Sequence, residues 1–183
     1  TAALLDVRLQ LKASKSFNFI SMLTNTVPGM VLGISYLFMF NDSSLKGTLM
    51  IIILSNVVHF FTTPFMMAKH ALSKMDHSWE ITGALLQDTL FKTVFRVILP
   101  NSKMTLFYIA NYYFINAMVT VSGVIFLVSS ETSLLSTWIK QLQHYAKYNE
   151  IFILSLIILI INVGMKILSQ IIIHKNKKRG ISK

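Results

Sequence analysis

The side chains that most often do chemistry in proteins are few and scattered in this sequence. His77 and Glu80 stand three residues apart, a spacing that places two side chains on one face of a helix. A metal site needs three or four ligands, and no second His or acid completes this set. The other histidines are dispersed, and no Ser-His-Asp order has a recognisable nucleophile elbow. The sequence therefore predicts neither a catalytic site nor a metal site.

Motifs for nucleotide and thiol chemistry are also missing from the sequence. No GxxxxGK[ST] loop is present to hold phosphates with its backbone N–H groups and a lysine. The chain contains no cysteine, so disulfides and thiolate metal sites are not available. We therefore expect a protein that is not an enzyme and that carries no cofactor.

The composition indicates a membrane protein. Hydrophobic residues make up 54% of the chain and charged residues 13%, against about 45–50% and about 25% in soluble domains. Three uncharged stretches have the length of membrane spans, and a fourth reaches that length if Lys166 snorkels to the interface. We predict an all-α polytopic membrane protein with one membrane domain over 1–183. Its four transmembrane helices are expected at about 16–41, 47–68, 104–130 and 151–174.

The basic residues orient these spans. All but three of the 17 Lys and Arg residues lie before the first span, in the 69–103 loop or toward the end of the chain, where Lys166 near the end of the fourth span is grouped with the residues after it; the exceptions are Lys46, Lys140 and Lys147. By the positive-inside rule, both termini of this segment and the 69–103 loop are cytoplasmic, in a multi-pass protein of the cell membrane. The same placement explains the net charge of +10 without a nucleic-acid partner. Thr1 opens no signal-peptide pattern, and we expect a piece of a longer protein.

The 69–103 loop is too long for a simple turn and has a helical pattern. Its apolar residues recur at steps of three, four or seven, so we expect one helical stripe and a helical loop. Pro100 biases Leu99 away from helical backbone angles, so we expect it to separate the loop from the next span. The stripe would cover the protein's own bundle or fit a partner's groove. It consists of Leu72, Met75, Trp79, Leu86, Leu90, Val94 and Val97.

Polar residues inside the spans are candidates for a translocation path. Polar groups within a bilayer are costly unless they face protein or water. Pro28 and Gly29 would break the first helix and free backbone groups toward a cavity. Taken singly, each polar side chain is explained by a hydrogen bond between helices; taken together they predict a passage. The candidates are Asn25, Asn56, His59, Asn116, Thr120 and Ser122.

The outer loop near residues 131–150 is predicted to contain a short helix. Its apolar and aromatic residues, among them Trp138 and Tyr145, follow a helical spacing over residues 134–145. Trp and Tyr favour the membrane interface, so a plain interfacial helix is one interpretation. A platform for a solute-binding protein is the other.

The 69–103 loop resembles the cytoplasmic loop of ABC importer permeases, the binding-protein-dependent transport family. Val97, Leu99 and Pro100 match the end of that family's signature, and Glu80 stands near its acidic residue. Thr82 and Gly83 stand near its paired alanines, and Gln87 replaces its usual glycine. The stretches 27–41 and 111–127 are similar to spans of ferric-iron and 2-aminoethylphosphonate type permeases. The resemblance covers residues 20 to about 174.

The resemblance implies a transport subunit driven by other chains. Members of the family have a core of about six spans, so this segment would be its C-terminal part. Their partners are ATP-binding cassette subunits, a second permease half or a homodimer partner, and an extracytoplasmic solute-binding protein. The coupling loop docks on the ATPase, and ATP-driven closure rocks the bundle between inward-facing and outward-facing states. The residues expected to couple to the ATPase are Glu80, Gly83, Leu85, Leu86, Leu90 and Pro100.

The solute and two other function classes remain open on sequence alone. The resemblance favours 2-aminoethylphosphonate or ferric iron as the solute, and the similarity of the stretch 111–127 favours 2-aminoethylphosphonate of the two. No charge specific for either solute lies in the spans, so the residues themselves do not decide between them. A membrane scaffold would use the cytoplasmic amphipathic helix only to recruit a partner. A channel would conduct without an ATPase.

Overall fold

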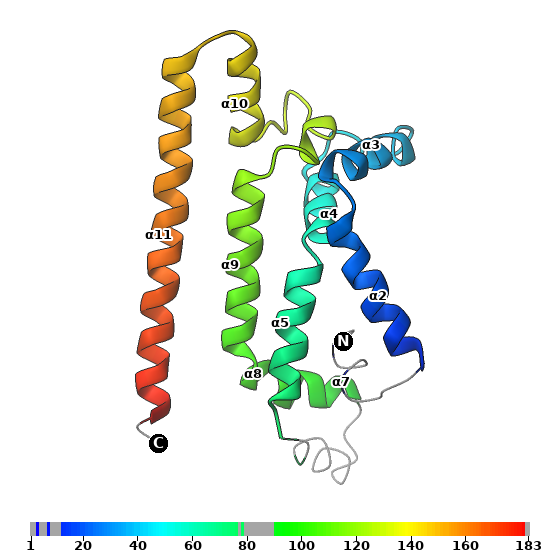
Figure 1. The fold of residues 1–183 in the computed structure, drawn as a ribbon, viewed down its shortest axis with the longest axis vertical. Helices are drawn as coiled ribbons and strands as arrows, with labels where there is room; N and C mark the ends of the chain where they lie inside the picture. The colour runs from blue at the N-terminus through cyan, green and yellow to red at the C-terminus, as the bar shows by residue number, and fades with distance from the viewer. Residues whose placement is uncertain (1–2, 4–6, 8–11, 77, 79–89, 182–183) are drawn as a thin grey trace. The chain divides into compact units, whose positions relative to one another are not determined.

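The computed structural model describes residues 3, 7, 12–76, 78 and 90–181. Every regular element within these ranges is helical, which confirms the all-α prediction (Figure 1). The chain divides into two compact units. Unit 1 comprises Thr1–Thr24 and Phe61–Ala110, and unit 2 comprises Asn25–Phe60 and Asn111–Lys183.

Unit 1 is built around a small apolar core between a helix and the segment before Pro100. Phe65 and Leu72 of one helix pack with Ile98 and Ala3, and Met75 and Val94 cover this core. The elements are α2 (Lys12–Thr26), α5 (Thr62–Ser73), α7 (Leu90–Thr93), the π-helical turn η1 (Val94–Ile98) and α8 (Leu99–Asn101), with α9 (Lys103–Val119) continuing into unit 2.

Unit 2 has a second apolar core and a helical hairpin. Ile51 and Ile52 pack with Val124 and Leu127, while the last two helices pack against each other (Figure 1). The elements are α3 (Gly29–Met39), α4 (Leu49–His59), the 3-10 turn η2 (Val124–Phe126), α10 (Leu135–His144) and α11 (Tyr148–Ile181). The helix α10 lies within the range predicted for a short outer helix.

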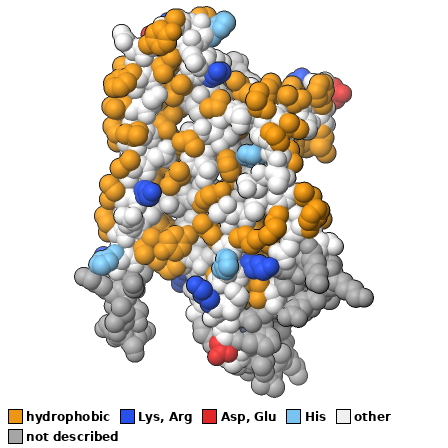
Figure 2. Space-filling view, in the orientation of Figure 1, with side chains coloured by type: hydrophobic (Ala, Val, Ile, Leu, Met, Phe, Trp, Pro, Cys, Tyr) orange, Lys and Arg blue, Asp and Glu red, His pale blue; other side chains and the backbone are white. Residues whose placement is uncertain are grey.

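Within the described residues, one helix is long and apolar enough to cross a membrane by itself, at Tyr148–Lys175. Two pairs of helices also meet that test if each bent pair counts as one span: Asn18–Thr26 with Gly29–Met39, and Leu49–His59 with Thr62–Ser73. The exposed side chains of α11 are mostly apolar, as Figure 2 shows. The count of four spans therefore remains a prediction.

Two prolines explain the interruptions in the first two predicted spans. Pro28 has extended backbone angles, φ −56° and ψ 136°, between α2 and α3, so the break expected there is confirmed. Pro64 lies in the first turn of α5, where its ring would clash with the carbonyl of Phe60 if the helix continued backward. The chain accordingly leaves the helix at Phe60, and α5 then runs to Ser73, beyond the predicted end at 68.

The third predicted span is helical over only part of its length. Helix α9 ends at Val119, and only the short turn η2 follows before residue 130. The sequence Val119-Thr120-Val121-Ser122-Gly123 combines β-branched residues with Ser and Gly, all weaker helix formers than Ala117 and Met118 directly before them. The irregular stretch is held in place when Ser136 Oγ donates a hydrogen bond of 2.9 Å to the Thr120 carbonyl.

The expected effect of Pro100 on Leu99 is wrong. Leu99 has helical angles, φ −59° and ψ −47°, and the helical segment passes through Pro100 before turning at Ser102. The Leu99 N–H donates to the Val94 carbonyl, five residues back. This wider π-type turn shifts the hydrogen-bond register just ahead of the proline, which has no N–H to continue it.

The single helical stripe expected along the loop is also wrong at its start. Helix α5 ends at Ser73, and the Met75 N–H closes the last turn on the Leu72 carbonyl. The Asp76 side chain then accepts a hydrogen bond of 2.9 Å from the Ser78 N–H, a turn geometry that competes with helix. Leu72, Met75 and Val94 do pack together, but α5 ends before Met75, so Leu72 and Met75 do not share one continuous helix.

Candidate functional site

All six predicted path residues belong to unit 2, where a close backbone contact positions two of them. Helix α3 packs its glycines against Gly123, and both Gly33 and Gly123 are buried. A Cβ atom on Gly33 would overlap the Gly123 carbonyl. Gly29 and Gly33 stand four residues apart, the spacing that lets backbones approach closely in membrane helices. The α3 backbone therefore lies directly against the irregular stretch that carries Ser122.

His59 and Ser122 meet beside Gly29. A Cβ atom on Gly29 would lie 2.6 Å from Ser122 Oγ and 3.4 Å from His59 Nε2. His59 Nδ1 is buried and has no hydrogen-bond partner among the described residues. The imidazole ring packs edge-on against Phe60, with ring centroids 4.7 Å apart. His59 Nε2 and the hydroxyl of the exposed Ser122 thus both lie within 4 Å of the same point beside Gly29.

The other predicted path residues do not join this pair through hydrogen bonds in the described structure. Asn56 is buried one turn before His59 and donates to the Ile52 carbonyl of its own helix at 3.1 Å. Asn116 likewise donates to the Tyr112 carbonyl at 2.8 Å. Thr120 lies just past the end of α9, and Asn25 is exposed near the end of α2. The side-chain amides of Asn56 and Asn116 thus donate hydrogen bonds to backbone carbonyls of their own helices.

The structural role of Gly33 and Gly123 was not predicted from the sequence. Gly29 was expected only to contribute to the helix break at Pro28. The signal was present as the Gly-x-x-x-Gly spacing at 29–33, but that pattern alone does not identify the surface on which the glycines pack. That surface is the backbone of Gly123, about 90 residues further along the chain.

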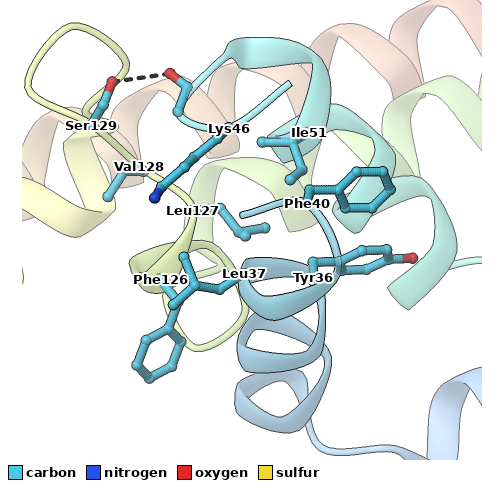
Figure 3. A pocket seen from close by; sticks show the side chains of 10 residues that line it. Tyr36, Leu37, Phe40, Lys46, Ile51, Phe126, Leu127, Val128 and Ser129 are labelled. Carbon is cyan, nitrogen blue, oxygen red and sulfur yellow. Dashed lines mark hydrogen bonds between the residues drawn. The ribbon is translucent and has the colours of Figure 1, made fainter. Parts of the chain in front are cut away.

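A second contact in unit 2 joins two loops at the far ends of α3 and α4 from this pair. Ser129 Oγ donates to the Gly47 carbonyl at 3.0 Å, and Thr132 Oγ1 donates to the same carbonyl at 3.1 Å. The Ser129 N–H donates to Thr132 Oγ1 at 2.9 Å. Gly47 has a φ of +71°, a region that glycine adopts without steric cost. We call these three residues the hydroxyl clasp; Figure 3 shows the Ser129 bond.

The coupling residues predicted from the resemblance belong to unit 1 and are only partly described. Glu80, Gly83, Leu85 and Leu86, as well as His77, lie outside the described residues. Leu90 begins α7, and Pro100 is exposed in α8. Between them, Ile98 is buried in the unit 1 core, whereas the Phe95 side chain is 69% exposed. The segment 90–101 is thus a helical platform anchored through Ile98.

Side-chain hydrogen bonds tie α5 to α2 within unit 1. Thr62 Oγ1 donates to the Ser21 carbonyl and lies 3.0 Å from Thr24 Oγ1. One turn before the end of α5, Lys69 Nζ donates to Asn18 Oδ1 at 3.1 Å. These bonds and the apolar core hold the described start of the 69–103 loop in a fixed place. Among the described residues, no three His, Asp or Glu side chains form a metal-binding group.

Comparison with known proteins identifies the family. The family model for the binding-protein-dependent transport system inner membrane component matches residues 1–178. Over 139 residues the chain is 32% identical to the ferric transport system permease protein FbpB of Actinobacillus pleuropneumoniae, covering 75% of this chain and 20% of that relative. Over 140 residues it is 34% identical to the putative ferric transport system permease protein FbpB 1 of Haemophilus influenzae, covering 75% and 22%.

The chain therefore spans about a fifth of the length of these two relatives. The family match covers nearly all of the chain, including the glycine contact, the His59–Ser122 pair and the segment before Pro100. The chain belongs to the inner-membrane permease family of binding-protein-dependent transport systems.

Proposed function

We propose that this chain is part of the permease subunit of an ATP-driven importer that moves ferric iron across the cell membrane. The observation that carries the proposal is the family match over residues 1–178, because it takes in both units except the last residues of α11. Ferric iron is preferred over 2-aminoethylphosphonate because both curated relatives are ferric transport permeases by name. The solute arrives on a solute-binding protein, and a separate ATPase supplies the energy.

The permease contributes a passage for the solute and a conformational change, and it catalyses no reaction. Two permease halves, or two copies of one permease, enclose the passage. Closure of the ATPase subunits is transmitted through the cytoplasmic loop, which rocks the bundle between its two states. The bent pairs α2–α3 and α4–α5 suit this role, because a helix broken at proline offers a defined place for bending.

The orientation proposed from the charges assigns the outer loops and the segment before Pro100 to opposite sides of the membrane. The hydroxyl clasp and the α10–α11 turn lie outside the cell, and the segment 90–101 lies in the cytoplasm. This chain has no cysteine, so single cysteines introduced at Ser43 and at Asn101, in a permease freed of any cysteine elsewhere, can be labelled individually. A membrane-impermeant maleimide added to whole cells should label the first and leave the second unlabelled.

His59 and Ser122 are proposed to line the path. The support is geometric: Nδ1 of His59 is a buried nitrogen without a hydrogen-bond partner among the described residues. The other ring nitrogen, Nε2, lies close to Gly29, as does the hydroxyl of the exposed Ser122. A buried polar group without a partner is costly, so a role in contacting solute or water accounts for it. His59→Leu should lower uptake about tenfold, as expected when one strong interaction is lost from a limiting step. Ser35→Ala is the matched control, because the one hydrogen bond of Ser35 Oγ within the described residues goes to the Val31 carbonyl of its own helix.

The coupling surface is proposed to comprise Glu80, Gly83, Leu85, Leu86, Leu90 and Pro100. Glu80 would pair with a basic residue of the ATPase, and the leucines would fill its groove. The exposed Phe95 lies in the segment 90–101, between Leu90 and Pro100, and adds an apolar side chain to the proposed coupling surface. The π-helical turn η1 and the buried Ile98 support the proposal, because a coupling segment must be fixed to its own bundle to transmit force.

The test of transport uses the complete permease with its ATPase in proteoliposomes. With the solute-binding protein outside, radioactive ferric iron should accumulate inside only when ATP is available to the ATPase. Unlabelled 2-aminoethylphosphonate should not compete. Accumulation of labelled 2-aminoethylphosphonate instead would overturn the choice of solute but keep the transport function. Iron flux that is equal with and without ATP would favour a channel and refute the importer.

A further inference from the structure

Unit 2 contains a pocket beside the hydroxyl clasp that is lined by none of the residues proposed for the path or for coupling. Its volume is about 340 Å³, and its wall is formed mainly by apolar side chains from α3, the start of α4 and residues 126–128 (Figure 3). Tyr36 and Phe40 stack along one wall, with ring centroids 5.9 Å apart. This volume falls in the range of about 300–1,000 Å³ that small-molecule sites occupy, and such sites are mostly apolar with few polar groups.

Lys46 supplies the one cation among the described residues that line this pocket. Figure 3 shows its side chain reaching from the 41–48 loop toward Leu127 and Val128. Its Nζ donates a hydrogen bond of 2.6 Å to Asn41 Oδ1, a neutral acceptor. The nearby Asp42 carboxylate accepts from the Asn41 amide, and no carboxylate pairs with Lys46 in the described part of the chain. The ammonium is therefore available to an anion.

The surface next to the pocket is apolar and exposed. Phe38 and Met39, which lie between the lining residues Leu37 and Phe40, are 77% and 76% exposed. Leu49 and Met50, just before the lining residue Ile51, are also exposed. Exposed apolar side chains at the ends of membrane helices suit contact with lipid tails. A lysine at the end of two apolar helices lies at the depth of the lipid headgroups.

We propose that this pocket binds an anionic phospholipid. The phosphate contacts the Lys46 ammonium, and the first part of an acyl chain occupies the hollow between Tyr36, Phe40 and Leu127. An acidic side chain of a protein partner would also suit Lys46. The exposed apolar flank favours the lipid, because it continues the hollow onto a surface that lipid tails already cover.

The test uses the complete transporter in nanodiscs that contain phosphatidylglycerol with a photoreactive group high on one acyl chain. Illumination should label peptides covering residues 36–51 and 126–129. Lys46→Gln should reduce this labelling about fivefold, the factor expected from one basic residue near a charged surface. The matched control is Lys140→Gln, which removes a lysine that bonds Gln143 away from the pocket and should leave labelling unchanged.

A second variant distinguishes the contribution of the apolar hollow to lipid binding from that of the Lys46 charge. Val128→Trp should fill the hollow and reduce labelling to a similar extent while keeping Lys46. Both variants should retain ATP-driven uptake, which shows that they fold. Equal labelling in wild type and Lys46→Gln, or equal competition by phosphatidylcholine, would overturn the proposal. Unchanged labelling together with weaker docking of the solute-binding protein in Lys46→Gln would overturn it in favour of a protein partner.

Discussion

At the scale of single residues, small side chains and backbone angles matter more than charge. The spacing of Gly29 and Gly33 was visible in the sequence, but their packing surface, Gly123, lies far along the chain and could not be inferred from local pattern. The break at Pro28 could be predicted, because proline constrains its own backbone and that of its neighbour. His59 was selected for its polarity within a span, and the structure adds its position beside Ser122.

The glycine contact makes a direct prediction about stability. Gly33→Ala should lower the free energy of unfolding by about 1–3 kcal/mol, because the added methyl overlaps the Gly123 carbonyl and must displace backbone. Gly164→Ala is the matched control: nothing lies within 4 Å of a Cβ there, and it should be neutral or stabilising by up to about 1 kcal/mol. Unfolding of the permease in mixed micelles measures both. Equal stability of the two variants would refute the close contact.

The turn between α10 and α11 contains a residue that glycine would suit better. Ala146 has a φ of +52°, and the N–H groups of Ala146 and Lys147 donate to the carbonyls of Gln143 and Leu142. This is the hydrogen-bond pattern of a Schellman helix end, where glycine is usual. Ala146→Gly should raise the free energy of unfolding by roughly 0.5–1 kcal/mol, because the left-handed strain exceeds the entropy cost of glycine.

The same unfolding assay provides the control for this turn. Ala117→Gly, within α9, should be destabilising by roughly 1 kcal/mol. If both alanine-to-glycine variants were destabilised alike, Ala146 would not be strained in the folded protein.

At the scale of elements, uncharged run length predicted where helices occur but not where they end. The absence of charged residues over 47–68 and 104–130 gave no reason to divide the helices. In the structure, however, α4 stops at His59 and α9 at Val119. Pro64 explains the first ending and the β-branched and glycine residues explain the second, but in both cases tertiary contacts also fix the irregular backbone. The π-helical turn before Pro100 was not predictable, because it depends on the packing of Ile98 in the unit 1 core.

The hydroxyl clasp joins two loops more than 80 residues apart in sequence, and it should act as a unit. Ser129→Ala and Thr132→Val each remove a hydrogen bond to the Gly47 carbonyl, and each bond contributes about 0.5–1.5 kcal/mol. Because the two hydroxyls also contact each other, the double variant should depart from additivity by at least about 0.5 kcal/mol. Unfolding of the wild type, the two single variants and the double variant measures the coupling energy between the two hydroxyl groups.

An unlinked pair supplies the control for the cycle. Ser35→Ala combined with Thr132→Val should be additive, because Ser35 bonds only its own helix. Strict additivity in the Ser129–Thr132 cycle would show that the clasp is not formed in the folded permease.

At the scale of the whole molecule, sequence motifs alone were enough to predict the family, and the match over residues 1–178 confirms that prediction. The resemblance was specific because several motifs agreed: the segment ending at Pro100, the span at 27–41 and the span after the loop. Charge placement predicted the orientation independently of the motifs. The arrangement of the complete permease could not follow from a chain that spans about a fifth of its relatives.

The central claim is that an ATPase on another chain drives this permease through the cytoplasmic segment ahead of Pro100. The most direct measurement is ATP-driven iron uptake and ATP hydrolysis on the same proteoliposomes, comparing the wild-type transporter with the Glu80→Ala, Leu86→Ala double variant. If the claim holds, uptake, hydrolysis stimulated by the binding protein and co-purification of the ATPase should all fall together, while the permease itself remains folded. Unchanged uptake, hydrolysis and co-purification in the double variant would contradict it.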